Sequence, residues 1–295
     1  YSPSSRLALN PLICDPAIVF GEDRIAVLKR ELGFAGGDLG AAPLINWPDA
    51  AAREFALLRT LFETFWRDLH DRPEDACCRD FLKFRQFAGN AVEGHALFET
   101  LSAERMRIDP LRSGWRNWPT ELRDPASATV AAFARDHAKD IAFHDFMQWL
   151  PQASLKAAQA EAIGSGVRIG LIADLAVGME SSGSHAWSRK SDVLTNLTIG
   201  APPDLFNPKG QNWGLTSFSP QSLMTEAFAP FLATLRTALA QAGGVRIDHA
   251  MGLARLWLIP EGAAPSEGAY LDYPLDDLLR LIKLESLRHR AVVNA

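Results

Sequence analysis

The sequence has no excess of positive charge and no long apolar run. Thirty Lys and Arg residues stand against 35 Asp and Glu residues, which gives a net charge of −5. Neither a nucleic acid backbone nor an anionic membrane is therefore an expected partner. No apolar stretch reaches the roughly 18 residues of a membrane span, and no basic segment leads into an apolar one at the start. We expect a cytoplasmic protein.

Cysteine is also scarce. The three cysteines, Cys14 and the adjacent Cys77 and Cys78, do not form the even, spaced set of a disulfide-stapled domain. A reducing compartment fits this usage. The 295 residues are 47% hydrophobic and 22% charged, which is typical of a folded globular chain of one large domain or two smaller ones.

Several familiar site motifs are absent. The sequence contains no G-x-x-x-x-G-K-[ST], H-E-x-x-H or G-x-S-x-G and no EF-hand loop, so it gives no support for a mononucleotide, zinc-protease, serine-hydrolase or calcium site. The glycines at 164, 166 and 170 follow a helix and precede a strand, the reverse of a dinucleotide loop. His137 and His144 lie seven residues apart in a helical stretch, and we interpret them as packing residues rather than metal ligands.

The first half of the chain predicts helices. Residues 51–69 place Phe55, Leu58, Phe62 and Phe65 at three- and four-residue steps, which indicates an amphipathic helix with a core-facing aromatic stripe. The stretches 80–100 and 126–150 are also helical in composition, so residues 51–150 are interpreted as a mainly helical insertion. A separate short helix is expected over residues 151–163, with Pro151 in its first turn.

The second half alternates between strands and helices. Strands are predicted over residues 167–174, 245–249 and 291–295, and helices over 226–242 and 275–290. Residues 178–222, rich in Pro and Gly, are expected to form a long functional loop, the least structured part of the chain. This order indicates an α/β protein with a parallel sheet, and polar residues at the strand ends favour a (β/α)8, or TIM, barrel.

The short run Arg246-Ile-Asp248 carries the first chemical signal. On a strand, residues two apart point to the same side, so the guanidinium of Arg246 and the carboxylate of Asp248 lie together. A nearby cation favours the ionised carboxylate that a nucleophile needs. A structural ion pair at the end of a strand is the alternative.

The loop of residues 201–214 carries the second signal. Asp204, Gln211 and Asn212 offer planar groups that bind paired hydroxyls, while Trp213 offers an indole for the apolar face of a sugar ring. This mixture predicts carbohydrate binding. A Pro- and Gly-rich turn anchored by the tryptophan is the alternative interpretation.

These residues together resemble the 4-α-glucanotransferases of the amylomaltase, or disproportionating enzyme, family. The resemblance rests on Tyr1-Ser-Pro-Ser-Ser with Leu9-Asn-Pro-Leu12, on Gly170–Gly178, on the loop from Pro202 to Gly214, and on Val245-Arg-Ile-Asp-His-Ala-Met-Gly252 with Trp257-Leu-Ile-Pro260. It extends over essentially the whole chain and is loose between about residues 20 and 140.

The resemblance implies a role for each matched residue. Asp248 matches the family's nucleophile in a retaining mechanism, in which a glycosyl-enzyme forms and a sugar hydroxyl resolves it. Malto-oligosaccharides or other α-1,4-glucans are the implied partners, with no metal or organic cofactor. The residues implied to bind substrate are Tyr1 on the acceptor side, Asp174 at the strand-end pocket, Asp204, Gln211 and Trp213 on the donor glucan, and Arg246 and His249 beside the nucleophile.

One departure from the family pattern affects the expected activity. The family's general acid/base is a glutamate in an E-D-L-G motif after the fifth strand, and here residues 291–295 correspond to that strand. The late aspartate of the family is not found either. We therefore expect an incomplete barrel in residues 1–295, inactive by itself, within a longer polypeptide. An amylase-like hydrolase that uses Asp248 and a catalytically inactive α-glucan-binding fragment remain alternatives.

Overall fold

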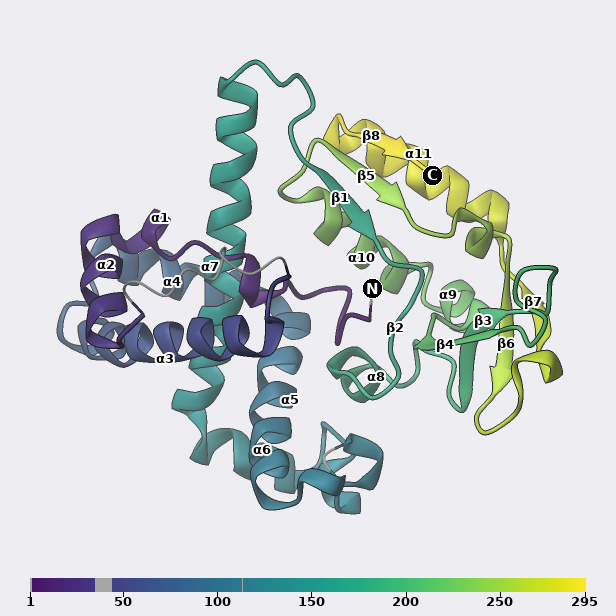
Figure 1. Cartoon of the computed structure of the whole chain (residues 1–295), viewed down its shortest axis with the longest axis horizontal. Coiled ribbons are helices and arrows are strands. Elements are labelled where there is room, and N and C mark those ends of the chain that lie inside the picture. The colour runs from purple at the N-terminus through teal and green to yellow at the C-terminus, as the bar shows by residue number, and fades with distance from the viewer. Residues whose placement is uncertain (1, 35–43, 113) are drawn as a thin grey trace.

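The computed structural model describes residues 2–34, 44–112 and 114–295 (Figure 1). Helices of the first half gather on one side of the molecule, and two β-sheets with their helices lie on the other. The first half contains the helices α1 (Ala17–Phe20), α2 (Glu22–Glu31), α3 (Trp47–Asp71), α4 (Ala76–Phe87), α5 (Gly89–Ile108), α6 (Ala128–Asp136) and α7 (Ala138–Gly164), with short 3₁₀ turns η1 (Pro11–Ile13), η2 (Pro110–Arg112), η3 (Trp115–Asn117) and η4 (Thr120–Leu122).

The aromatic stripe of α3 builds the core of the helical part, as its spacing predicts. Phe62 and Phe65 are buried in α3 and face Phe146 and Trp149 of α7. The rings of Phe62 and Phe146 are 5.4 Å apart, and those of Phe65 and Trp149 stack at 5.7 Å. Burial of each such side chain contributes about 1.5–3 kcal/mol, so this contact holds α3 against α7.

The prediction of a separate helix after Leu150 is wrong. α7 runs without interruption from Ala138 to Gly164, with Pro151 inside it. Proline removes one backbone hydrogen bond from a helix interior. Here Leu150, Pro151 and Ser154 are all buried against the rest of the molecule, so tertiary packing outweighs the local cost. The description of residues 51–150 as an insertion stays a prediction, although their helical character is confirmed.

A parallel sheet lies at the centre of the second half. It contains three strands in the order β1 (Ile172–Leu175), β5 (Gly244–Ile247) and β8 (Val292–Asn294). Both pairs are parallel, which confirms the α/β class. The helices α10 (Ala229–Leu239) and α11 (Leu275–His289) pack beside it. β1 begins later than predicted, because Gly170 adopts φ +74°, a left-handed conformation that interrupts an extended strand.

The prediction that residues 178–222 form a long loop, the least structured part of the chain, is wrong. They contain helix α8 (Ser184–Ser188), the start of α9 (Pro220–Thr225) and three strands of an antiparallel sheet. The order of that sheet is β2 (Met179–Glu180), β4 (Gln211–Thr216), β3 (Leu197–Ala201), β6 (Arg255–Pro260) and β7 (Ala269–Asp272). Ile199, Leu215, Leu256 and Leu258 form its buried face. Short strands separated by Pro and Gly conceal this pattern in the sequence.

Cys14, Cys77 and Cys78 are free thiols, and burial raises the pKa of Cys77 to about 12. Within the ranges that the structure describes, no helix combines the length and apolarity required to cross a bilayer.

Candidate functional site at the strand ends

One guanidinium joins two aspartates at the ends of β1 and β5. The parallel register pairs Asp174 of β1 with Arg246 of β5. Arg246 Nη1 donates to Asp174 Oδ2, and Arg246 Nη2 donates to Asp248 Oδ1 at 3.0 Å. The three side chains are partly exposed, at 36% for Asp174, 44% for Arg246 and 27% for Asp248. The ion-paired carboxylates of Asp174 and Asp248 are therefore accessible to solvent.

The alternation of β5 explains this arrangement. Val245 and Ile247 are buried at 0% and 7% exposure, so Arg246 projects from the opposite side of the strand. The backbone N–H of Asp248 donates to the carbonyl of Leu175 at 3.0 Å, which continues the pairing with β1 by one residue. Arg246 and Asp248 thus lie together, as their spacing predicts.

His249, two residues after the end of β5, and Trp213 of β4 come together. His249 has φ +48°, an uncommon conformation for a residue with a side chain, and functional sites often contain such positions. Its imidazole contacts the indole of Trp213 edge to face, with ring centroids 5.1 Å apart. The indole Nε1 of Trp213 donates to Gln211 Oε1 at 3.0 Å, so Gln211 supports the tryptophan within β4.

Trp213, His249 and Asp248 line a cavity of about 490 Å³. Its walls are Ser2, Val177, Trp213, Leu215, Asp248 and His249. The carboxylate of Asp248 therefore borders a space large enough for a sugar ring, rather than packed hydrocarbon. Ser2, Val177 and Leu215 were not predicted as site residues. Their signal in the sequence is weak, because they reach the cavity from three separate segments.

Asp204 does not line this cavity. Its Oδ1 accepts the backbone N–H groups of Phe206 and Asn207 at 2.7 and 2.6 Å, a local turn at the tip of the β3–β4 connection. Leu205 and Phe206 at that tip are 95% and 93% exposed. Tyr1, the acceptor-side residue of the sequence analysis, lies outside the described residues. The assignments of Asp204 and Tyr1 to substrate binding stay predictions.

A second cavity, of about 750 Å³, reaches Asp174 from the helical part. Its polar lining includes His95 and Glu99 of α5 and His144 of α7. Burial lowers the pKa of His95 to about 4 and that of His144 to about 3, and it raises the pKa of Glu99. Both imidazoles are therefore neutral near pH 7.

The two histidines of the predicted packing pair have different surroundings. His144 borders the second cavity, whereas His137 precedes α7 and stacks on Phe133 at 4.0 Å. In the described part of the chain, no three or more His, Cys, Asp or Glu side chains gather in a way that suits a metal ion.

Comparisons with known proteins agree on one family. A family model described as 4-alpha-glucanotransferase matches residues 1–295. The chain is 39% identical over 213 residues to the 4-alpha-glucanotransferase of Mycobacterium bovis, covering 72% of this chain and 29% of that protein. It is 38% identical over 302 residues to the 4-alpha-glucanotransferase of Haemophilus influenzae, covering 99% and 43%.

A solved structure agrees in fold. The crystal structure of amylomaltase from Corynebacterium glutamicum aligns with a TM-score of 0.76 at 26% identity, covering 99% of this chain and 38% of that one. The chain spans less than half the length of the two curated relatives, at 29% and 43%.

Proposed function

The chain belongs to the 4-alpha-glucanotransferase family, and from this premise we propose that the protein transfers α-1,4-linked glucan segments between malto-oligosaccharides. One observation supports the proposal above the others. The carboxylate of Asp248 pairs with Arg246 and faces a cavity of about 490 Å³ beside Trp213 and His249. An anionic oxygen, an aromatic platform and an open volume are what a retaining enzyme needs around a sugar ring.

In this proposal Asp248 is the nucleophile. Its oxygen forms a bond to the anomeric carbon of the donor glucan, while the bond from that carbon to the leaving sugar's oxygen breaks. The leaving oxygen takes a proton from a general acid. A hydroxyl of the acceptor sugar then attacks the same carbon, returns a proton to that group and releases Asp248.

The general acid must be a second carboxyl group. Asp174 shares the guanidinium of Arg246 with Asp248, and we assign it to substrate binding. We assign the acid to a glutamate outside these 295 residues. In the same proposal β1, β5 and β8 are neighbouring strands of a (β/α)8 barrel, whose carboxyl ends carry the catalytic groups.

The substrate-binding roles follow from position. Trp213 stacks on a sugar face and His249 lies against both the indole and the nucleophile's cavity. Gln211 holds the indole through its amide oxygen. Asp204 and Tyr1 keep the glucan-binding roles that the family resemblance implies.

The proposed transferase function is tested by incubating maltotriose with the full-length polypeptide that the gene encodes. A transferase yields glucose together with a ladder of longer maltodextrins, and Asp248→Asn removes the ladder. Shorter sugars alone would instead identify a hydrolase. Binding of maltoheptaose without any turnover would identify an inactive glucan-binding protein and overturn the proposed reaction.

A further inference from the structure

A segment near the start of the chain joins the helical part to the sheets. We call residues Ser2–Asn10 the strap. It lies between the helices and the strands (Figure 1). On the helical side, Gln148 of α7 binds both backbone groups of Leu9: its Nε2 donates to the carbonyl at 3.0 Å, and its Oε1 accepts the N–H at 2.8 Å.

The strap is bound equally well on the sheet side. The backbone N–H of Glu180 donates to Pro3 O at 2.9 Å, and that of His185 donates to Ser4 O at 3.0 Å. Gly183 permits this approach, because a Cβ there would lie 2.5 Å from Ser4 O. The two sets of contacts fix both ends of the strap.

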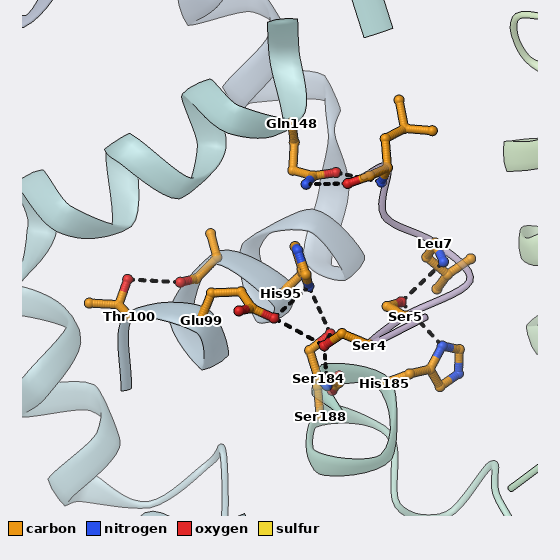
Figure 2. Close-up of polar contacts among 12 residues, drawn as sticks. Ser4, Ser5, Leu7, His95, Glu99, Thr100, Gln148, Ser184, His185 and Ser188 are labelled. Atoms are coloured by element: carbon orange, nitrogen blue, oxygen red, sulfur yellow. Dashed lines mark hydrogen bonds and ion pairs between the residues drawn. The ribbon is translucent and has the colours of Figure 1, made fainter. Parts of the chain in front are cut away.

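The hydroxyl of Ser4 connects the two sides (Figure 2). Ser4 Oγ donates to Glu99 Oε1 of α5 at 3.0 Å and accepts the backbone N–H of Ser184, the first residue of α8, at 2.9 Å. Ser184 Oγ lies 2.7 Å from Nδ1 of His95 and 3.2 Å from Ser4 Oγ. We call Ser4, Glu99, His95 and Ser184 the latch.

The latch is not arranged as a hydrolytic triad. Ser184 is only 1% exposed, so no substrate reaches its hydroxyl. Ser184 Oγ and Glu99 Oε1, the latter at 3.7 Å, both lie near the same imidazole nitrogen of His95. A triad needs the serine and the acid on opposite nitrogens, so this cluster holds groups in position rather than activating a nucleophile.

The latch fixes a segment that lines the candidate site. Ser2 precedes Ser4 by two residues and lines the cavity of Asp248, Trp213 and His249. A second anchor acts from the other side of Ser4: Arg6 Nη1 donates to the carbonyls of Ala176 and Val177 at 3.0 and 3.3 Å. Its guanidinium also lies over the ring of Phe218, 4.4 Å from the centroid.

We propose that Ser4 is a positioning residue, whose hydrogen bonds to Glu99 and Ser184 fix the strap so that Ser2 forms part of the wall of the sugar-binding cavity that Trp213 also lines. This inference rests on the proposed transferase function. None of the four latch residues lines the cavity of Asp248. The latch acts on sugar binding through the position of the strap, so its loss affects binding more than the chemical step.

Ser4→Ala tests the inference, with Ser188→Ala as the matched control. Ser188 Oγ donates to the carbonyl of Ser184 at 2.7 Å within α8, and among the described residues it makes no hydrogen bond to the strap. In the complete polypeptide acting on maltotriose, Ser4→Ala should raise KM about fivefold, the effect of one lost hydrogen bond, and change kcat less than about twofold. Ser188→Ala should change neither.

The partner residue provides a rescue. Glu99→Gln keeps an oxygen that accepts from Ser4, so its KM should stay near that of the unchanged protein, whereas Glu99→Leu should match Ser4→Ala. A KM within twofold of the unchanged protein for both Ser4→Ala and Glu99→Leu would overturn the inference. A rise in KM for Ser188→Ala equal to that for Ser4→Ala would also overturn the inference, since it would indicate that any substitution in or beside α8 loosens that helix.

Hydrogen exchange separates this inference from the proposed function. If the unchanged protein makes no maltodextrin ladder, the transferase proposal fails by itself. Amide exchange in the strap should still become about tenfold faster in Ser4→Ala than in Ser188→Ala, with exchange in α3 and α7 unchanged. Unchanged exchange of the strap would overturn the positioning role whether or not the protein is a transferase.

Discussion

The imidazole of His249 contacts the indole of Trp213 edge to face, with ring centroids 5.1 Å apart and planes at 82°. This contact joins the end of a parallel strand to the antiparallel sheet. It orients the indole at the rim of the cavity that Asp248 borders. The aromatic surface and the carboxylate therefore lie at fixed positions around one bound ring.

Replacement of the indole should weaken sugar binding. Trp213→Ala is expected to lower the affinity for maltoheptaose about tenfold, because stacking of one ring face is lost. Titration calorimetry on an Asp248→Asn background measures this without turnover. Trp257→Phe is the control, since Trp257 packs on Tyr270 at 5.0 Å in the same sheet but does not line this cavity. Equal affinity in the Trp213 and Trp257 variants would exclude the stacking role.

Neutralisation of the nucleophile should remove catalysis and leave the fold intact. Asp248→Asn has the same shape but no charge to attack an anomeric carbon, so kcat in the complete polypeptide should fall at least ~10³-fold. Circular dichroism should stay unchanged. Asp272→Asn, on the exposed edge strand β7, is the matched control and should keep full activity. Turnover of Asp248→Asn near that of Asp272→Asn would exclude Asp248 from the mechanism.

The sequence could predict those parts of the fold that depend on residues close together in the chain. Arg246 and Asp248 share one side of β5 because alternation is a property of a single strand. The helix α3 follows from the spacing of its aromatic residues. By contrast, Pro151 remains inside α7 only because its neighbours are buried against other elements, and no pattern within α7 itself contains that information.

The strap contacts and the antiparallel sheet depend on residues that are far apart in the sequence. Ser4 is separated by 95 residues from Glu99 and by 180 from Ser184, so the latch exists only after the chain has folded. β3 and β4 are short, and the Pro- and Gly-rich segment between them resembles a loop. Side chains that line one cavity from such distant segments, Ser2 and Trp213 included, could not be assigned to it beforehand.

Close packing in that sheet leads to a prediction about stability. A Cβ on Gly200 would lie 2.0 Å from the carbonyl oxygen of Gln211, so Gly200→Ala must shift β3 against β4. The expected loss of unfolding free energy is about 1–3 kcal/mol. Gly164→Ala, at the end of α7, meets no atom within 4 Å and should stay within about 0.5 kcal/mol. Urea denaturation of both variants measures the difference, and equal midpoints would contradict the geometry.

Acid should destabilise the folded protein below about pH 6.5 through its buried histidines. Burial lowers the pKa of His95 to about 4 and those of His144 and His185 to about 3. As pH falls, the unfolded chain therefore protonates these histidines before the folded protein does. The free energy of unfolding that the neutral histidines contribute is complete above pH 6.5 and is lost as pH falls towards 4. Asp145 opposes this trend, because burial raises its pKa to about 6 and its folded form takes up a proton earlier.

Glu54 and Glu99 oppose this trend in the same direction, because burial raises their pKa values too. The three histidines hold pKa values of about 3 to 4 in the folded protein, far below 6.5, so we expect the net slope to keep their sign. Between pH 6.5 and 5 we expect the unfolding free energy to fall by roughly 1.4–2.7 kcal/mol per pH unit, equivalent to one or two protons. Urea denaturation across this range measures the slope. His185→Gln removes one buried imidazole and should reduce it by about one proton's share, or 1.4 kcal/mol per pH unit. His70→Gln, at an exposed position in α3, should leave the slope unchanged. An unfolding free energy that rises on acidification would contradict the prediction and show that the buried carboxyl groups dominate.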